Sequence, residues 1–212
     1  MNDKVYTHSI NHSNFNSKSD IKKLSDILDS KKLLSLRKRG YKDSTGFSGL
    51  DYISLCDYEK RGITNHGKPF CNGFYAYTRH GISLAFDKDK INERYEVIIP
   101  NILNVNIKKN EFFHYMGVLG NAVERYSDLP DEVQIKDEVS LEGLSFITYP
   151  VEEYFYSHLF IKQENKRKRL IQELNNLKSV LESHNYDLDV YDIDSKLLLN
   201  EEGIEKILTK KY

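Results

Sequence analysis

Three short segments of the chain carry residue types that can do chemistry, and long stretches of sequence separate them. His8 stands near the end of an apolar, β-branched stretch, Ser54 lies within a second, and Glu132 begins a third. A carboxylate can stabilise positive charge that develops on a substrate, and it can deprotonate an attacking group. We therefore take Glu132 as a candidate catalytic residue and His8 as a candidate binding residue. The structural alternatives are a solvated acid and a hydrogen-bonded strand-end histidine.

Further candidates lie close to the second segment. Arg61 follows it, and a guanidinium group can bind a phosphate through two parallel hydrogen bonds or act on an acceptor. The rings of Tyr52, Tyr75 and Tyr77 can stack on a flat ligand. Each of these residues, taken singly, is equally explained as a core or surface residue, and the Ser54 hydroxyl as one bonded to the backbone.

The elements that must position these residues are mainly strands. Helical spacing of apolar residues predicts one early helix over residues 20–30, and a second is expected over residues 112–123. Strands are expected over residues 5–10, 52–56, 75–78, 82–86, 94–99, 105–108, 132–135 and 144–147. Residues 57–69 are expected to form a loop. The pattern is typical of an α+β domain without repeated βαβ units.

The last 60 residues have a different character. Residues 152–184 contain no Gly or Pro, and an apolar seam recurs at helical spacing through Leu170, Leu174, Leu177 and Leu181. We expect this helix to pack on the main domain, and the alternative is a homodimer through the seam. A strand over residues 185–194 and a helix over residues 201–210 follow. The expected organisation is a domain at residues 1–150 with a helical extension at 151–212.

Composition excludes several classes. The net charge of −1 argues against a uniformly basic nucleic-acid binder, although residues 31–42 carry six basic side chains and no acid. Cys56 and Cys71 lack metal-ligand spacing, and we expect no metal. The polar first residues and the lack of an 18-residue apolar stretch predict a cytoplasmic protein without a membrane partner. The common nucleotide, metalloprotease and hydrolase motifs are absent from the sequence.

The order of the segments resembles the ADP-ribosyltransferase-fold proteins, with the DarT-like group and the poly-ADP-ribose polymerase branch as the nearest match. The resemblance lies in Tyr6-Thr7-His8 at the end of a strand, in the helix and Lys-Leu phrase of residues 24–35, and in residues 132–141. It covers residues 5–150 in short pieces. It implies a split antiparallel sheet with flanking helices, NAD as substrate, and a catalytic acid at Glu132, with Glu138 second.

In that resemblance His8 would bind the NAD ribose or carboxamide, and Ser54 with one of the tyrosines would line the nicotinamide pocket. The acceptor would be a nucleic acid or a protein. Two alternatives stay open. One is another reaction of NAD on the same fold, such as its hydrolysis or RNA 2′-phosphate transfer. The other is a non-catalytic interaction protein, for example a phage or bacterial accessory factor.

Overall fold

The computed structural model describes residues 4–10, 17–42, 50–57, 62–63, 69–70, 82–98, 132–151 and 162–192. Their elements, in chain order, are β1 (Val5–Ser9), α1 (Ser17–Ser30), β2 (Lys32–Leu34), β3 (Tyr52–Asp57), β4 (Gly62–Ile63), β5 (Pro69–Phe70), β6 (Ser83–Asp87), α3 (Lys88–Arg94), β7 (Glu132–Lys136), β8 (Glu138–Ser140), η5 (Leu141–Gly143), β9 (Leu144–Tyr149), α6 (Gln163–Ser183) and β10 (Asp189–Asp192). The α+β class expected from the sequence is confirmed.

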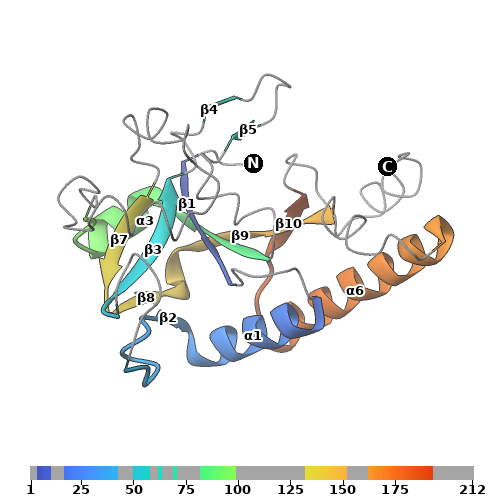
Figure 1. The fold of residues 1–212 in the computed structure, drawn as a ribbon, viewed down its shortest axis with the longest axis horizontal. Helices are drawn as coiled ribbons and strands as arrows, with labels where there is room; N and C mark the ends of the chain where they lie inside the picture. The colour runs from blue at the N-terminus through green and yellow to red at the C-terminus, as the bar shows by residue number, and fades with distance from the viewer. Residues whose placement is uncertain are drawn as a thin grey trace, which may run out of the picture.

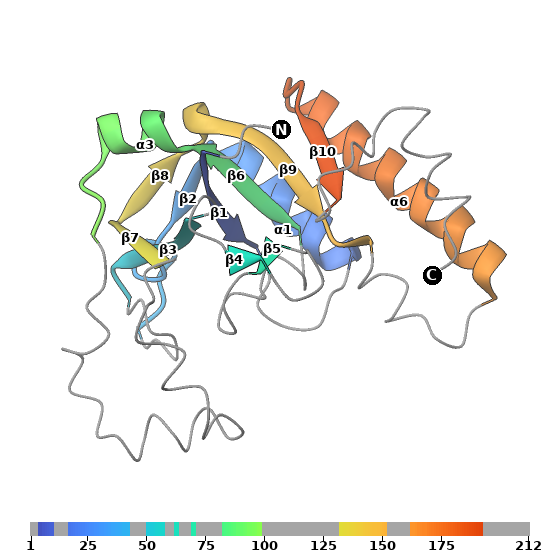
Figure 2. The same ribbon diagram turned by 90° about the horizontal axis from the view of Figure 1, so that it is seen from above.

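A six-stranded sheet in the order β10-β9-β6-β1-β3-β7 forms the centre of the fold. Both helices α1 and α6 lie against the same side of this sheet, as Figure 1 and the orthogonal view in Figure 2 show. Strand β1 occupies an interior position, with β6 and β3 as its antiparallel neighbours. Strand β7 pairs with β3 along its whole length. The first and third predicted segments therefore lie two strands apart in one sheet.

The core fills the space between the sheet and the two long helices. In α1 the buried residues Ile21, Leu24 and Leu28 follow helical spacing and form the stripe predicted from the sequence. All four leucines of the α6 seam are also buried, and they belong to the same core cluster as the α1 stripe. The seam therefore packs inside the chain, and a homodimer through this helix would have to use its other face.

The sheet is mixed, because β10 runs parallel to β9 while the other neighbouring strands are antiparallel. Two adjacent parallel strands need a long crossover, and here the segment between them contains α6. The wholly antiparallel sheet expected from the sequence is wrong at this edge. Strand β10 completes the main sheet, so the expected boundary at residues 150/151 falls inside a strand–helix–strand unit.

Two small sheets accompany the large one. Strand β2 pairs antiparallel with β8, and β4 pairs antiparallel with β5. Between β7 and β8 the backbone turns at Asp137, whose φ of 64° is in the left-handed region. The Asp137 N–H donates to the Asp51 carbonyl at 2.7 Å, and its carbonyl accepts from Ser35 N–H at 2.8 Å. These bonds hold the β2–β8 sheet against the start of β3. The pair β4–β5 lies in the stretch expected to be a loop.

One short helix was not predicted. Residues 88–94 form α3, where the Asp87 side chain accepts a hydrogen bond from the Lys90 N–H at 3.0 Å and so caps the helix. Only Ile91 of this helix is buried, so the segment lacks the apolar spacing that predicts a helix. The strand expected over residues 94–99 is wrong: past α3, the described residues form a single isolated bridge, which joins Ile98 to Gln134 of β7.

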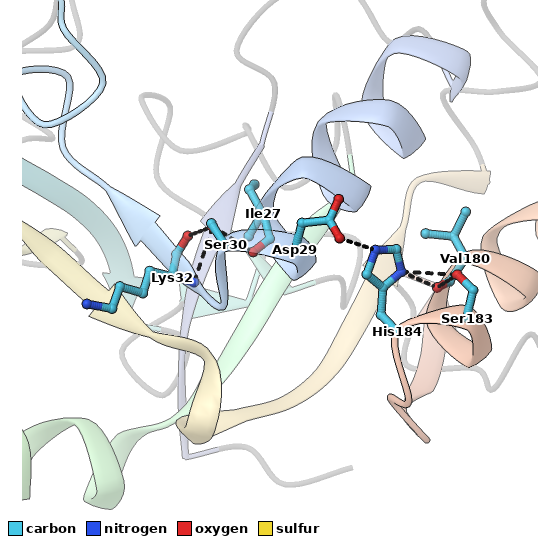
Figure 3. A network of polar contacts seen from close by, with 7 residues as sticks. All are labelled: Ile27, Asp29, Ser30, Lys32, Val180, Ser183 and His184. Atoms are coloured by element: carbon cyan, nitrogen blue, oxygen red, sulfur yellow. Dashed lines mark hydrogen bonds and ion pairs between the residues drawn. The ribbon is translucent and has the colours of Figure 1, made fainter.

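The C-terminal ends of α1 and α6 are tied together by His184 (Figure 3). Its Nε2 lies 3.1 Å from Asp29 Oδ1, and its Nδ1 lies 2.7 Å from the Val180 carbonyl oxygen. Asn185 follows with a φ of 60°, and its N–H donates to the Glu182 carbonyl, which is a common way to end a helix. The His184 contacts and the turn at Asn185 together fix where the chain leaves α6 and turns into β10.

Candidate functional site

His8 stands where the ladder between two central strands ends. Strand β1 pairs with β6 through all five of its residues, but with β3 through two, Tyr6 with Asp57 and Thr7 with Cys56. Directly after the second pair, the His8 ring takes up a hydrogen bond to β3, with Nδ1 2.9 Å from the Ser54 carbonyl oxygen. A side chain thus replaces the backbone partner at this point, and the sheet opens between β1 and β3.

This hydrogen bond determines the state of the imidazole. A carbonyl oxygen can only accept, so His8 Nδ1 must carry the hydrogen. In the neutral ring, Nε2 is then the acceptor. The ring is half-buried, which limits its contact with water. His8 is therefore an oriented histidine with one nitrogen committed to the fold, as residues that contact a ligand through the second nitrogen commonly are.

Ser54 contacts His8 through its backbone and not through its hydroxyl. Ser54 lies between Ile53 and Leu55, and both of these neighbours are buried in the core beneath the sheet. Side chains alternate along a strand, so Ser54 and Tyr52 project to the opposite face. Across β6, His8 lies opposite the core residue Leu84, on the helix-covered side. The predicted His8 and Ser54 come together, but their side chains occupy different faces.

Glu132 opens β7, one strand away from Ser54. Its Cα partner in β3 is Cys56, two residues from Ser54, and the next pairs are Leu55 with Val133 and Ser54 with Gln134. The register therefore places the backbone of Glu132 at the same end of the β3–β7 pair as the last β1–β3 pair, Thr7 with Cys56. The side chain of Glu132 lies outside what the structure describes.

Glu138, the second candidate acid, has a different environment. It lies on β8 in the small sheet opposite Leu34, and its Oε1 accepts a hydrogen bond from Lys32 Nζ at 2.6 Å. The hydrogen bond and the charge of Glu138 raise the pKa of Lys32 above its ordinary value. The Glu138 carboxylate is therefore already engaged in an ion pair with Lys32. Three further candidates, Arg61, Tyr75 and Tyr77, lie outside the described residues.

A row of hydroxyl groups crosses the sheet on the face away from α1 and α6, and the sequence analysis missed it. Ser9 pairs with Ser83, Ser83 with Thr148, and Thr148 with Tyr191, so four adjacent strands each contribute one hydroxyl. Ser83 is 0% and Thr148 7% exposed, and neither hydroxyl oxygen has a hydrogen-bond partner within the described part of the chain. The available signal was a Ser or Thr residue within each of the otherwise apolar strands β1, β6 and β9.

Buried hydroxyl groups are normally hydrogen-bonded, and each exception needs an explanation such as a bound water or ligand. At the β10 end of the row, the Tyr191 hydroxyl donates to Asp189 Oδ2 at 2.9 Å, and its ring meets Phe146 edge-on with centroids 5.2 Å apart. Burial and the bond to Asp189 raise the pKa of Tyr191, so the phenol stays protonated near neutral pH. The row therefore consists of neutral donors and acceptors.

The strongest ion pair near β3 joins Arg37 to Asp51. The guanidinium contacts both carboxylate oxygens, and its Nη2 lies 3.1 Å from Oδ2. This pair holds the pKa of Asp51 below its ordinary value of 3.8, mainly through the hydrogen bond from Arg37. Because the pair is exposed to solvent, we expect it to contribute little to stability.

Among residues with described positions, no three His, Cys, Asp or Glu side chains gather in a way that would hold a metal ion. Within the same residues, no helix is both long enough and apolar enough to cross a membrane.

Comparison with known proteins gives no relative for this chain. No family model matches the sequence, no curated protein matches it, and no solved structure matches its fold.

Proposed function

We propose that the chain is an NAD-dependent ADP-ribosyltransferase, with Glu132 as the catalytic carboxylate and His8 as a residue that binds NAD. The observation that carries the proposal is the position of His8. It is held by Ser54 at the point where the β1–β3 ladder ends, and Glu132 begins the strand that continues the sheet beyond β3. The three segments singled out for their chemistry are thus neighbours in one sheet.

The early end of the β1–β3 ladder also supports the finer fold assignment. The family that the sequence resembles has a split antiparallel sheet. Here the pairing on either side of the junction is complete, because β1 pairs fully with β6 and β3 with β7 along five residues. The opening between β1 and β3 is therefore a local feature at His8, and we propose it as the place where NAD enters.

The proposed reaction transfers the ADP-ribosyl group from nicotinamide to an acceptor. The bond between ribose C1′ and the nicotinamide nitrogen breaks, and its electron pair leaves with neutral nicotinamide. An oxygen or nitrogen nucleophile of the acceptor forms the new bond to C1′ and loses its proton. Glu132 would stabilise the positive charge that develops on the ribose and accept that proton. His8 would orient the ribose or carboxamide through Nε2.

The first experiment follows nicotinamide release from NAD by the purified chain, with and without single-stranded DNA, RNA and a protein lysate. Release that depends on one of these additions supports transfer and identifies the class of acceptor. Release without any addition would replace the proposal with NAD hydrolysis. If no release occurs and NAD does not raise the melting temperature, the chain is not an NAD enzyme.

Two matched variants test the residue assignment. Glu132→Gln should lower release at least 100-fold with an unchanged melting temperature, because it removes the charge and keeps the shape. Glu138→Gln makes the same substitution at a carboxylate that is paired with Lys32. It should leave the rate of nicotinamide release within about twofold of that of the parent chain. The reverse pattern would move the catalytic role to Glu138. His8→Ala should raise the KM for NAD.

A further inference from the structure

A basic turn, defined as residues 36–42, projects from the end of the small β2–β8 sheet. Its backbone N–H groups make four hydrogen bonds to backbone carbonyl groups. Arg37 N–H donates to the Leu50 carbonyl at 2.8 Å, and Arg39 N–H donates to the Ser35 carbonyl at 3.0 Å. Gly40 and Tyr41 donate to the carbonyls of Arg37 and Leu36. Gly40 has a φ of 85°, which a residue with a side chain rarely adopts.

The charge of this turn is not neutralised within the described part of the chain. Arg37 is paired with Asp51, but no described carboxylate forms an ion pair with Lys38, Arg39 or Lys42. All three side chains are exposed. A solvated basic surface is common, so the charge alone does not identify a partner.

An exposed aromatic ring lies among these cations. Tyr41 is 51% exposed, more than any other large hydrophobic residue with a described position. The Arg39 guanidinium carbon lies 5.3 Å from the centre of its ring, a cation–π contact that holds the two side chains together. This ring sits on a hydrogen-bonded turn with cations on both sides of it in the sequence. This combination points to a ligand that has both a flat face and negative charge.

We propose that the basic turn binds single-stranded nucleic acid, with a base stacked on Tyr41 and phosphates contacted by Lys38, Arg39 and Lys42. Unpaired bases stack on aromatic side chains, and the backbone follows positive charge, so one short strand satisfies both features. An acidic peptide or an anionic lipid surface would use the cations but would not need a stacking ring. The proposal goes beyond NAD chemistry and does not depend on it.

The test measures the binding of fluorescent single-stranded DNA and RNA oligonucleotides to the full chain, without NAD, over a range of salt concentrations. Three phosphate contacts predict that log K falls with log salt concentration with a slope of about −2. Tyr41→Ala should weaken binding about tenfold with the slope unchanged, because stacking does not release counterions. Tyr41→Phe should bind like the parent chain.

Removing charge should have a different effect. Lys38→Gln together with Lys42→Gln should make the salt slope shallower by about 1.4, since each lost contact accounts for about 0.7. The charge-matched control is Lys22→Gln together with Lys23→Gln, two exposed lysines on α1. This control should bind like the parent chain. All variants are expected to keep the melting temperature, because the changed side chains are exposed.

Three results would overturn the proposal. Oligonucleotides fail to bind at low salt, or Tyr41→Ala binds as well as Tyr41→Phe, or heparin and vesicles containing phosphatidylserine bind as tightly as the oligonucleotides and show the same loss on Lys38→Gln. The comparison of DNA with RNA then decides which sugar the strand carries. Since NAD is absent throughout, failure here is separate from failure of the transferase assay.

Discussion

On the side of the large sheet that faces α1 and α6, the strands present Leu84, Phe86 and Ile147 to a continuous core. On the other side the same strands β6 and β9 present Ser83 and Thr148, and both are also buried. Strands that alternate between these two kinds of residue build two different environments from one set of elements. The helix-covered face stabilises the fold through apolar contact.

On the face of the sheet away from α1 and α6, which we call the hydroxyl face, hydroxyl groups without a hydrogen-bond partner lower the stability of the fold. Burying a hydroxyl without a hydrogen bond costs about 1–3 kcal/mol, and two such groups lie side by side at Ser83 and Thr148. Natural proteins tend to violate the rules of good packing at sites that serve a function. The difference between the faces lies in these unpartnered hydroxyl groups, since the face away from the helices also buries the apolar residues Val5, Ala85 and Phe146. Four measurements test this distinction.

The largest effect is expected on the helix-covered face. Leu174→Ala removes a fully buried side chain from the α6 seam and should cost about 2–5 kcal/mol of unfolding free energy. Asn175→Ala, at the next and exposed position of the same helix, should change stability by less than about 0.5 kcal/mol. Urea unfolding measures both. A loss for Leu174→Ala that varied with protein concentration would mean that the seam joins two chains.

On the hydroxyl face, we expect a substitution to change the unfolding free energy in the opposite direction. Thr148→Val replaces an unpartnered buried hydroxyl with a methyl group of the same shape and should raise the unfolding free energy by about 1–3 kcal/mol. The matched control is Thr7→Val, a buried threonine of the same face that takes part in an interaction, and it should lose stability. Destabilisation by Thr148→Val would show that its hydroxyl binds an ordered water or another group.

The hydrogen bond between β9 and α6 should affect the unfolding free energy less than the changes at Leu174 and Thr148. The Tyr149 hydroxyl donates to Glu173 Oε2 at 2.8 Å beneath the sheet. Tyr149→Phe keeps the buried ring and should cost about 0.5–1.5 kcal/mol. Thermal unfolding in parallel with Glu173→Gln, which keeps an acceptor oxygen, checks the value. An equal loss in both variants would indicate that the strength of the hydrogen bond depends on the negative charge of Glu173.

The smallest effect concerns pH. Arg37 lowers the pKa of Asp51 in the folded chain, so the pair contributes stability above the unfolded pKa near 3.8. This contribution is lost as pH falls through the lower folded pKa. Asp51→Asn should therefore make the decline of stability below about pH 4 slightly shallower. Melting temperatures measured between pH 3 and pH 7 test this, and a steeper decline in the variant would contradict the assignment.

Several elements could be predicted because their sequences carry local patterns. The apolar spacing in α1 and the β-branched stretches of β1, β3, β7 and β9 gave these elements, each within a few residues. The helix expected over residues 152–184 is present as α6 over Gln163–Ser183, and residues 152–161 lie outside the described residues. Helix α3 could not be predicted this way, since a single buried residue, Ile91, leaves no periodic pattern. The predicted helices over residues 112–123 and 201–210, and the strands over 75–78 and 105–108, lie outside the described residues.

The candidate site likewise has some features that the sequence predicted and others that it could not predict. The sequence alone singled out His8 and Ser54 by residue type, and it determined that apolar residues alternate along the strands that carry them. The tertiary structure alone brings these two residues together, because strand register depends on pairing between segments that are 46 residues apart. It also decided that the His8 ring contacts the Ser54 backbone and that the hydroxyls of four strands form one row. Such arrangements are non-local, so no pattern within one segment encodes them.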